Sequence, residues 1–237
     1  MKKRRIVAES PGAAHPNPSS DAAKVRRPLL GAEFMIAAAV PAQWPPAGPA
    51  EIAFAGRSNS GKSSAINVLA RRTRLAFASR TPGRTQQIVF FALADGARAA
   101  DLPGYGYAAV SRDIKREWQR SLWDYVTTRS TLVGLVLVAD SRHGLKPLDL
   151  ALLDGFVPSG RPVMILATKS DKLNIAQRRD AAAAIRAAVD ARYAGAGAVE
   201  VILFSATTHV GLEVADAVLD AWLPRPEPPG ATLRRAE

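Results

Sequence analysis

Hydrophobic and polar positions divide the chain into alternating strands and helices from residue 51 onward. Short apolar runs predict strands near residues 51–55, 87–94, 97–101, 132–139, 162–167 and 199–204. Apolar side chains at helical spacing predict helices near residues 62–71, 112–128, 147–156, 174–193 and 211–223. Such alternation is typical of a mostly parallel central sheet with helices on both faces. The pattern therefore predicts a three-layer α/β/α fold.

Both ends of the chain lack this periodicity. Residues 1–30 mix Pro, Ser and Ala with seven Lys or Arg and two acidic residues, so we expect a disordered basic extension. The run AEFMIAAAV, residues 32–40, predicts a peripheral strand, and a Pro-rich connector follows it. Residues 224–237 are also Pro-rich and are expected to form a disordered tail. One domain over residues 31–223 is the organisation that this length favours.

Composition excludes several classes of function. The chain contains no Cys, which removes thiol catalysis, disulfides and Cys-ligated metals. Its longest apolar run, residues 132–139, is too short to cross a bilayer, and MKKRR is not followed by the apolar segment of a signal peptide. We therefore expect a cytoplasmic protein with no membrane partner. The net charge of +11 is only a weak sign of nucleic-acid binding, because the excess of Arg and Ala resembles coding bias.

The stretch AGRSNSGKSS, residues 55–64, contains the first functional motif. Gly56 and Gly61 let the backbone curl so that several N–H groups point at one anion. Lys62 and Ser63 add a positive charge and a hydroxyl, which suit a polyphosphate that carries a divalent metal. The spacing G-x-x-x-x-G-K-S between a predicted strand and a predicted helix is that of the phosphate-binding loop. A plain glycine turn before a helix is the alternative.

Two further stretches complete the phosphate end of such a site. DLPG closes an apolar strand, with Asp101 placed to reach metal-bound water and Gly104 placed to contact the terminal phosphate. SRTPGRTQ, residues 79–86, lies between the phosphate loop and DLPG. It contains Thr85, a hydroxyl able to take the second protein position on magnesium. Loops of this kind become ordered when the terminal phosphate is present.

The stretch TKSD, residues 168–171, is the candidate for base recognition. A carboxylate can accept hydrogen bonds from both the ring N–H and the exocyclic amine of guanine, so Asp171 would select guanine over adenine. Lys169 would lie along the base plane. Thr168 stands where Asn is usual, and a Thr-Lys turn before a helix capped near Asn174 is the alternative.

The stretch LFSATTHVG, residues 203–211, follows the last predicted strand. Backbone N–H groups of Ser205 and Ala206 could contact the guanine oxygen. This turn would therefore complete the base site.

The predicted helix 112–128 has two contrasting sides. Its apolar stripe consists of Ile114, Trp118, Leu122 and Tyr125. Its basic residues lie largely off that stripe and are Arg112, Lys115, Arg116 and Arg120. A core face with a solvated basic back is the main interpretation, and a contact surface for RNA is the alternative.

The order of five motifs resembles the EngB (YihA/YsxC) family of bacterial ribosome-biogenesis GTPases, in the TrmE-Era-EngA-EngB-septin-like superfamily. The motifs are GRSNSGKSS, TPGRTQ, DLPGYGYA, VADSRHGLKPLD and TKSDK. The resemblance covers about residues 32–223; the family commonly has Thr at position 168, whereas Ser60 stands where Val or Ala is usual. It implies a P-loop NTPase fold and slow, Mg²⁺-dependent GTP hydrolysis. It also implies a switch in assembly of the large ribosomal subunit, needed for normal division and septation.

The resemblance also implies which residues contact the nucleotide. Lys62 would neutralise the phosphates, Ser63 and Thr85 would hold Mg²⁺, Asp101 would fix the metal's water shell, and Gly104 would contact the terminal phosphate. We expect Lys62, Thr85 and Gly104 to be the catalytic residues. The implied contact residues are Gly56, Arg57, Ser58, Asn59, Ser60, Gly61, Lys62, Ser63, Ser64, Gly83, Arg84, Thr85, Gln86, Gln87, Asp101, Leu102, Pro103, Gly104, Thr168, Lys169, Ser170, Asp171, Phe204, Ser205 and Ala206.

The residue after Gly104 suggests why hydrolysis would be slow. It is Tyr105, where many signalling GTPases place a Gln that orients the attacking water. We hypothesise that the side-chain oxygen of Asn59 binds K⁺ beside the phosphates and stabilises part of the developing charge. Several related GTPases with G-x-x-N-x-G-K-S loops are similar in being stimulated by potassium. The alternative is that Asn59 only tolerates an unusual backbone angle.

Two other functions remain open from the residues alone. A small-molecule phosphotransferase would share only the phosphate loop and would leave TKSD unexplained. An RNA-binding scaffold with a vestigial nucleotide site would tolerate the loss of Lys62. For a GTPase, the expected partners are guanine nucleotide and a large-subunit precursor, with its rRNA and ribosomal proteins. Residues 62–94 hold six Lys or Arg and no acid, which suits a phosphate-rich partner, and we expect a monomer.

Overall fold

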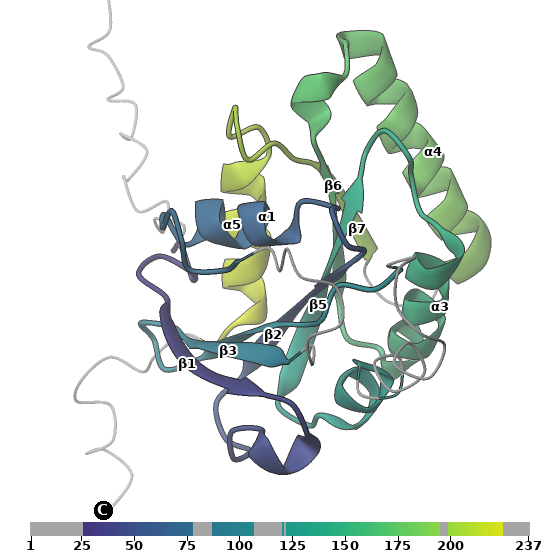
Figure 1. The fold of residues 1–237 in the computed structure, drawn as a ribbon. Coiled ribbons are helices and arrows are strands. Elements are labelled where there is room, and N and C mark those ends of the chain that lie inside the picture. The colour runs from purple at the N-terminus through teal and green to yellow at the C-terminus, as the bar shows by residue number, and fades with distance from the viewer. Residues whose placement is uncertain (1–25, 78–86, 107–119, 121, 195–198, 225–237) are drawn as a thin grey trace, which may run out of the picture.

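The computed structural model describes residues 26–224 except for 78–86, 107–119, 121 and 195–198. A seven-stranded sheet forms the centre of the molecule, and helices cover both of its faces (Figure 1). The strands are β1 (Glu33–Ala38), β2 (Glu51–Gly56), β3 (Ile88–Ala92), β4 (Arg98–Asp101), β5 (Leu132–Asp140), β6 (Val163–Thr168) and β7 (Val199–Leu203). The labelled helices are α1 (Lys62–Leu69), α3 (Pro147–Phe156), α4 (Ile175–Tyr193) and α5 (Leu212–Trp222).

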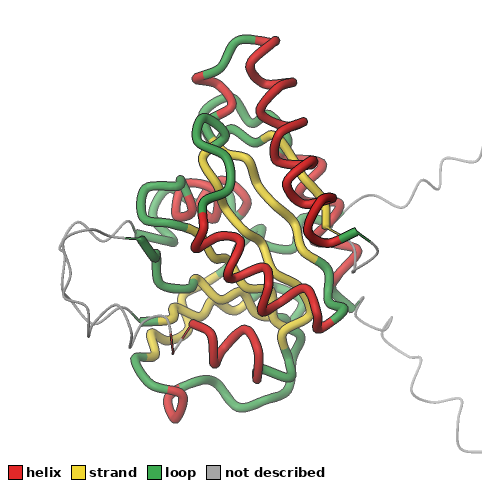
Figure 2. Tube along the Cα trace, turned by 90° about the vertical axis from the view of Figure 1, so that its right-hand side faces the viewer, coloured by secondary structure: helices red, strands yellow, loops and turns green. Residues whose placement is uncertain are grey.

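The strand order is β1-β3-β4-β2-β5-β6-β7. Figure 2 shows the strands together as one twisted sheet. Strands β4, β2, β5, β6 and β7 are parallel, whereas β3 pairs antiparallel with both β1 and β4. The predicted mostly parallel sheet in a three-layer fold is therefore confirmed. Because the five parallel strands end at the same edge, the loops that follow them meet there, which is where α/β sheets bind ligands.

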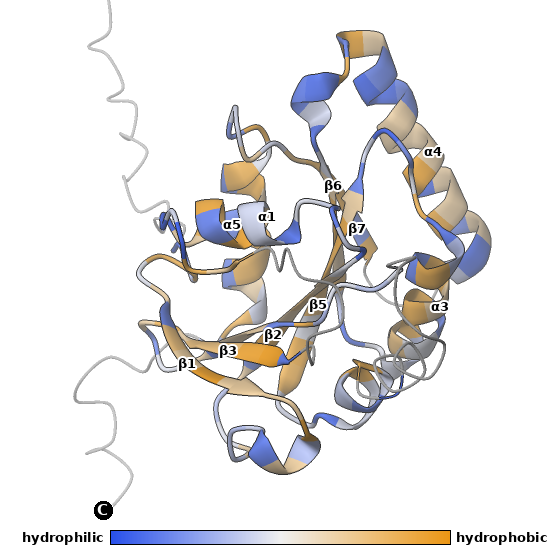
Figure 3. Cartoon of the chain, in the orientation of Figure 1, coloured by the Kyte–Doolittle hydropathy of each residue, from blue (hydrophilic) through white to orange (hydrophobic). Residues whose placement is uncertain are grey.

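Each face of the sheet has its own hydrophobic core. Val136 and Val138 of β5 pack in one core with α1 and α5, and Leu135 and Leu137 pack in the other with α3 and α4. A strand buried on both faces needs apolar residues at consecutive positions rather than alternate ones. This requirement explains the continuous run LVGLVLVA. Figure 3 shows hydrophobic colour along β5, whereas the helices around the sheet carry both hydrophobic and hydrophilic residues.

The predicted helix 112–128 is described only in its C-terminal part, where residues 122–128 are helical. Leu122 and Tyr125 are buried there, which confirms the predicted apolar stripe for these two residues. Arg120 is exposed, as expected for the basic side. Residues 112–119, with the rest of the stripe and the other basic side chains, lie outside the described residues.

Residues 26–30, which the sequence analysis placed in the N-terminal extension, pack against the domain. Leu29 is fully buried in the core beside α1 and α5. The Arg26 guanidinium donates to Asp220 on α5 and contacts Asp95 in the turn between β3 and β4. The packed part of the chain therefore includes these five residues.

Strand β2, which leads to the phosphate loop, is anchored at its start by the fully buried Glu51. Arg129 donates to both carboxylate oxygens, and Tyr125 and Arg98 each donate to one of them. Burial alone would raise the pKa of Glu51, but these hydrogen bonds and the Arg129 charge hold that pKa below its ordinary value. A buried charge needs such compensation.

Candidate nucleotide-binding site

The phosphate loop lies between β2 and α1, as the sequence predicts. Asn59 and Gly61 have left-handed backbone angles, with φ of 67° and 96°. At Gly56, a Cβ atom would lie 2.6 Å from the carbonyl oxygen of Val138 and 2.8 Å from Ser60 Oγ. Only glycine fits there without a shift of neighbouring β5, so the close packing of loop and strand accounts for Gly56.

The structure joins the phosphate loop to the DLPG motif. Lys62 begins α1, and its ammonium group contacts Asp101 Oδ1 at the end of β4. Both side chains are largely buried. Burial raises the pKa of Asp101, although the positive charge of Lys62 opposes that shift. Two motifs separated by 39 residues thus place a cation and a carboxylate in direct contact.

Gly104 lies against the opposite end of the phosphate loop. Ser58 Oγ is 3.4 Å from the carbonyl oxygen of Gly104 and donates to it. A Cβ atom on Gly104 would lie 3.2 Å from Ser58 Oγ, which leaves little room for a side chain. Leu102 and Pro103, between Asp101 and Gly104, are buried.

The donor groups near Lys62 suit magnesium. Ser63, half-buried in the first turn of α1, offers a hydroxyl, and Asp101 offers a carboxylate. Mg²⁺ favours oxygen ligands and is usually bound through few protein groups together with waters and substrate phosphates. Among the described residues, no group of three or more His, Asp or Glu side chains could hold a metal by itself. The chemistry therefore fits a metal that is bound together with a phosphate.

The TKSD motif closes the other side of the phosphate loop. Thr168 Oγ1 donates to the carbonyl oxygen of Ser60 and lies 3.0 Å from that of Ala139. Lys169, with φ of 58°, donates from Nζ to the carbonyl oxygen of Asn59 at 2.7 Å. A threonine hydroxyl is thus sufficient to join β6, β5 and the loop, which gives a physical reason for Thr in place of the usual Asn.

Asp171 and Ser205 meet at the ends of neighbouring strands. Ser205 Oγ donates to Asp171 Oδ1 at 2.7 Å and accepts hydrogen bonds from the N–H groups of Thr207 and Thr208. The Ser205 hydrogen bond is the main cause that holds the pKa of Asp171 below its ordinary value. The carboxylate is therefore ionised at neutral pH and held in place by Ser205.

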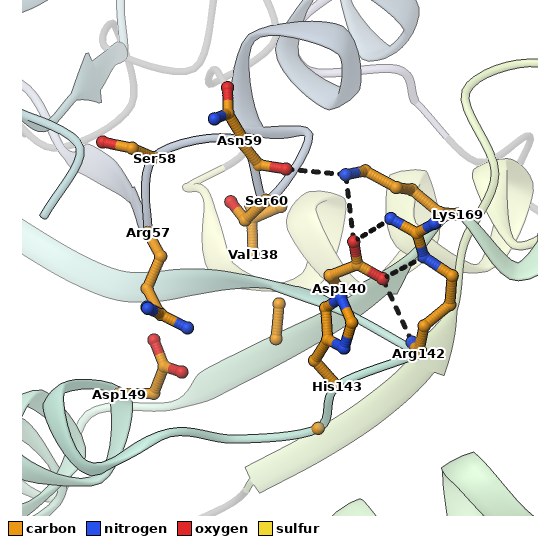
Figure 4. A pocket seen from close by; sticks show the side chains of 12 residues that line it. Arg57, Ser58, Asn59, Ser60, Val138, Asp140, Arg142, His143, Asp149 and Lys169 are labelled. Atoms are coloured by element: carbon orange, nitrogen blue, oxygen red, sulfur yellow. Dashed lines mark hydrogen bonds and ion pairs between the residues drawn. The ribbon is translucent and has the colours of Figure 1, made fainter. Parts of the chain in front are cut away.

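A cavity of about 200 Å³ lies beside the phosphate loop (Figure 4). Its wall includes Asp140 at the end of β5, which accepts hydrogen bonds from Arg142 and is 2.9 Å from Lys169 Nζ. Burial raises the pKa of Asp140, but the hydrogen bonds from Arg142 and Lys169 outweigh it and hold the pKa far below its usual range. Asp140 thereby orients Lys169.

The remaining predicted residues divide between described and undescribed parts. Ser170 and Phe204 are fully buried, Ala206 is half-buried, and Ser64 and Gln87 are exposed. Gly83, Arg84, Thr85 and Gln86 lie outside the described residues. Asp140, Arg142 and Asp149 had no predicted role, although their motif VADSRHGLKPLD is one of the five that carry the family resemblance. An acidic residue at the end of a strand, as in DLPG, was the available signal for Asp140.

A strand, a phosphate loop and a helix, together with a carboxylate that contacts the loop lysine and the ordered carboxylate of the TKSD motif, define the class of P-loop GTPases. Residues 51–169 match the family described as 50S ribosome-binding GTPase. The probable GTP-binding protein EngB of Azoarcus sp. (strain BH72) is 52% identical over 192 residues, which cover 81% of this chain and 91% of the relative. The relative of the same name from Bordetella pertussis is 45% identical over 202 residues, which cover 82% of this chain and 96% of the relative. The chain belongs to the EngB family of GTP-binding proteins and is a GTPase.

Solved structures share the fold at low sequence identity. The crystal structure of a probable GTP-binding protein EngB has a TM-score of 0.56 at 20% identity, over 72% of this chain and 97% of that one. The crystal structure of Era in complex with MgGDPNP and a segment of 16S ribosomal RNA has a TM-score of 0.57 at 20% identity, over 76% of this chain and 58% of that one. Among the described helices, none is long and apolar enough to cross a membrane.

Proposed function

We propose that this GTPase hydrolyses GTP slowly with Mg²⁺ and acts as a nucleotide-dependent switch in assembly of the large ribosomal subunit. The observation that carries the proposal is that the TKSD motif connects the phosphate loop to an oriented carboxylate, which is the proposed reader of the base. Asp171 is held by Ser205, and the preceding Lys169 bonds the loop at Asn59. A guanine nucleotide could therefore contact both ends of one site.

The roles of the site residues follow from their positions. Lys62 and the loop N–H groups would neutralise the phosphates, and Gly104 would meet the terminal phosphate. Ser63 and Thr85 would hold Mg²⁺, which supplies charge neutralisation at the phosphates when it is bound, and Asp101 would orient the metal's waters. The other predicted contact residues surround these groups. On nucleotide binding, the Lys62 ammonium would exchange its contact with Asp101 for one with phosphate oxygens.

The site also supports a low intrinsic rate. Tyr105, at the position of the usual water-orienting Gln, has its hydroxyl bonded to Asp149 on α3. With its hydroxyl bonded to Asp149, the Tyr105 side chain would not be free to orient the attacking water at the phosphates. The left-handed φ of Asn59 is one that Asn adopts readily, and its exposed side-chain amide points away from Asp140 (Figure 4). We propose that this amide oxygen binds K⁺ beside the phosphates.

Basic side chains support a ribosomal partner. Arg71, Arg72 and Arg74 are exposed after α1, in the segment that leads to the 79–86 stretch. Binding of GTP would order that stretch and fix its charges, so the GTP state would bind phosphate-rich particles more tightly. The proposed partner is a large-subunit precursor, bound by a monomer in the cytoplasm, and normal septation would depend on this activity.

Sedimentation of cell lysate on a gradient tests this proposal. With a non-hydrolysable GTP analogue, the protein should migrate with large-subunit particles, and with GDP it should stay near the top. Lys62→Ala serves as a control, because a GTP-dependent switch would lose the migration whereas an RNA scaffold would keep it. The proposal is overturned if nucleotide makes no difference, or if the protein follows only other particles.

A further inference from the structure

Tyr105 connects the DLPG motif to α3. Its hydroxyl donates to Asp149 Oδ1 at 2.7 Å. Asp149 lies in the first turn of α3, is 1% exposed, and accepts the Lys146 N–H at its other oxygen at 2.8 Å. A single carboxylate thus caps the helix and holds the tyrosine that follows Gly104.

The backbone of Tyr105 is bound to the phosphate loop at the same time. Its carbonyl oxygen accepts the Ser58 N–H at 2.9 Å, and its N–H donates to the carbonyl oxygen of Gly56 at 3.4 Å. On the other side of Gly104, the Leu102 N–H donates to the carbonyl oxygen of Phe54 at 2.9 Å. The position of Gly104 is therefore fixed by contacts on both sides of it.

The surroundings favour this hydrogen bond at neutral pH. Burial raises the pKa of Tyr105 well above its ordinary value, and the nearby Asp149 charge raises it further, so the phenol keeps its proton. Burial raises the pKa of Asp149, although the hydrogen bond from Tyr105 and the charge of Arg57, which faces Asp149 in Figure 4, oppose that shift. A buried carboxylate that loses a hydrogen-bond donor is destabilised, so the Tyr105 contact is worth more than an exposed one.

We propose that Tyr105 and Asp149 are positioning residues for GTP hydrolysis, which hold Gly104 where it meets the terminal phosphate. The inference rests on the proposed role of Gly104. Because GDP lacks the terminal phosphate, loss of the Tyr105–Asp149 hydrogen bond should lower the affinity for GTP and its hydrolysis rate, and leave the affinity for GDP unchanged. Tyr105 also packs against the core beside α3. If this packing were its only role, its substitution would change the affinities for GTP and GDP equally or leave both unchanged.

The test compares Tyr105→Phe with the unaltered full-length protein. The substitution removes the hydroxyl and keeps the ring, so packing is preserved. We expect the single-turnover hydrolysis rate and the affinity for a non-hydrolysable GTP analogue to fall about ten- to a hundredfold, with GDP affinity within about twofold. Asp149→Asn, whose amide can still bond the tyrosine, should retain more activity than Asp149→Ala.

Tyr193→Phe is the matched control. The Tyr193 hydroxyl also bonds an α3 carboxylate, that of Asp154 at 2.9 Å, but away from the phosphate loop. Tyr193→Phe should leave the hydrolysis rate, the affinity for the GTP analogue and the affinity for GDP unchanged. The inference is overturned if Tyr105→Phe leaves hydrolysis and the ratio of analogue to GDP affinity unchanged, or if it lowers GDP affinity equally. Failure of the unaltered protein to hydrolyse GTP would refute the proposed function instead.

Discussion

Asp171→Asn should change base specificity with little effect on stability. The carboxylate is only 12% exposed and is oriented by Ser205, so it can accept two hydrogen bonds from guanine. Asn keeps one acceptor and turns an N–H toward the second donor. Each hydrogen bond to the charged carboxylate is worth about 1.5–3 kcal/mol; one is lost and the other becomes a neutral bond of about 1 kcal/mol, so the loss is about 2–5 kcal/mol. GDP affinity should therefore fall by about 30- to 5,000-fold.

Calorimetric titration of GDP, ADP and xanthosine diphosphate measures this effect. The unaltered protein should bind GDP far more tightly than ADP, and Asp171→Asn should prefer the xanthine nucleotide, whose C2 carbonyl oxygen accepts the new N–H. Asp180→Asn, an exposed substitution of the same kind on α4, should leave all three affinities unchanged. GDP affinity within threefold of normal in Asp171→Asn would refute the assignment of the base site.

The remaining predictions concern catalysis and stability. In Na⁺ the unaltered protein should hydrolyse GTP at about 10⁻⁴ to 10⁻³ per second and faster in K⁺ at equal ionic strength; Asn59→Ala should lose this rise and keep its GDP affinity. Identical rates in the two salts would leave Asn59 with a backbone role only. Burial raises the pKa of Asp216 from 3.8 to about 6, so the folded state holds a proton that the unfolded state releases. The stability that Asp216 contributes is therefore lost as the pH rises from about 4 to about 6. Denaturant unfolding should show that the free energy of unfolding of Asp216→Asn rises by about 2–3 kcal/mol relative to that of the unaltered protein over this pH range. A difference between the two proteins that does not change with pH would contradict this prediction.

Local sequence signals were sufficient for most of the framework. The run LVGLVLVA predicted a strand, and the structure explains its continuous apolar residues, because both faces of β5 are buried in a core. The predicted helix near residues 174–193 is α4, which begins after Asn174, whose side chain accepts the Gln177 N–H as an N-cap. These features depend on neighbours in the sequence, which a pattern of residues records directly.

Contacts between distant segments were not predictable in this way. Glu51 is buried because Arg129, Arg98 and Tyr125 converge on it from elsewhere in the chain. Nothing local to Tyr105 indicates that its hydroxyl reaches Asp149, 44 residues later. The Glu51 cluster forms where parallel strands begin together, and the Tyr105–Asp149 pair forms at the opposite edge, where they end, so both follow from topology.

The affinity of the purified protein for purified large-subunit precursors tests the proposed switch most directly. It should be measured with a non-hydrolysable GTP analogue and with GDP, at several salt concentrations. We predict binding about 5- to 150-fold tighter with the analogue, and a steep decrease with salt as bound counterions are released. Equal affinity in the two nucleotide states would contradict the switch, even if the protein binds GTP.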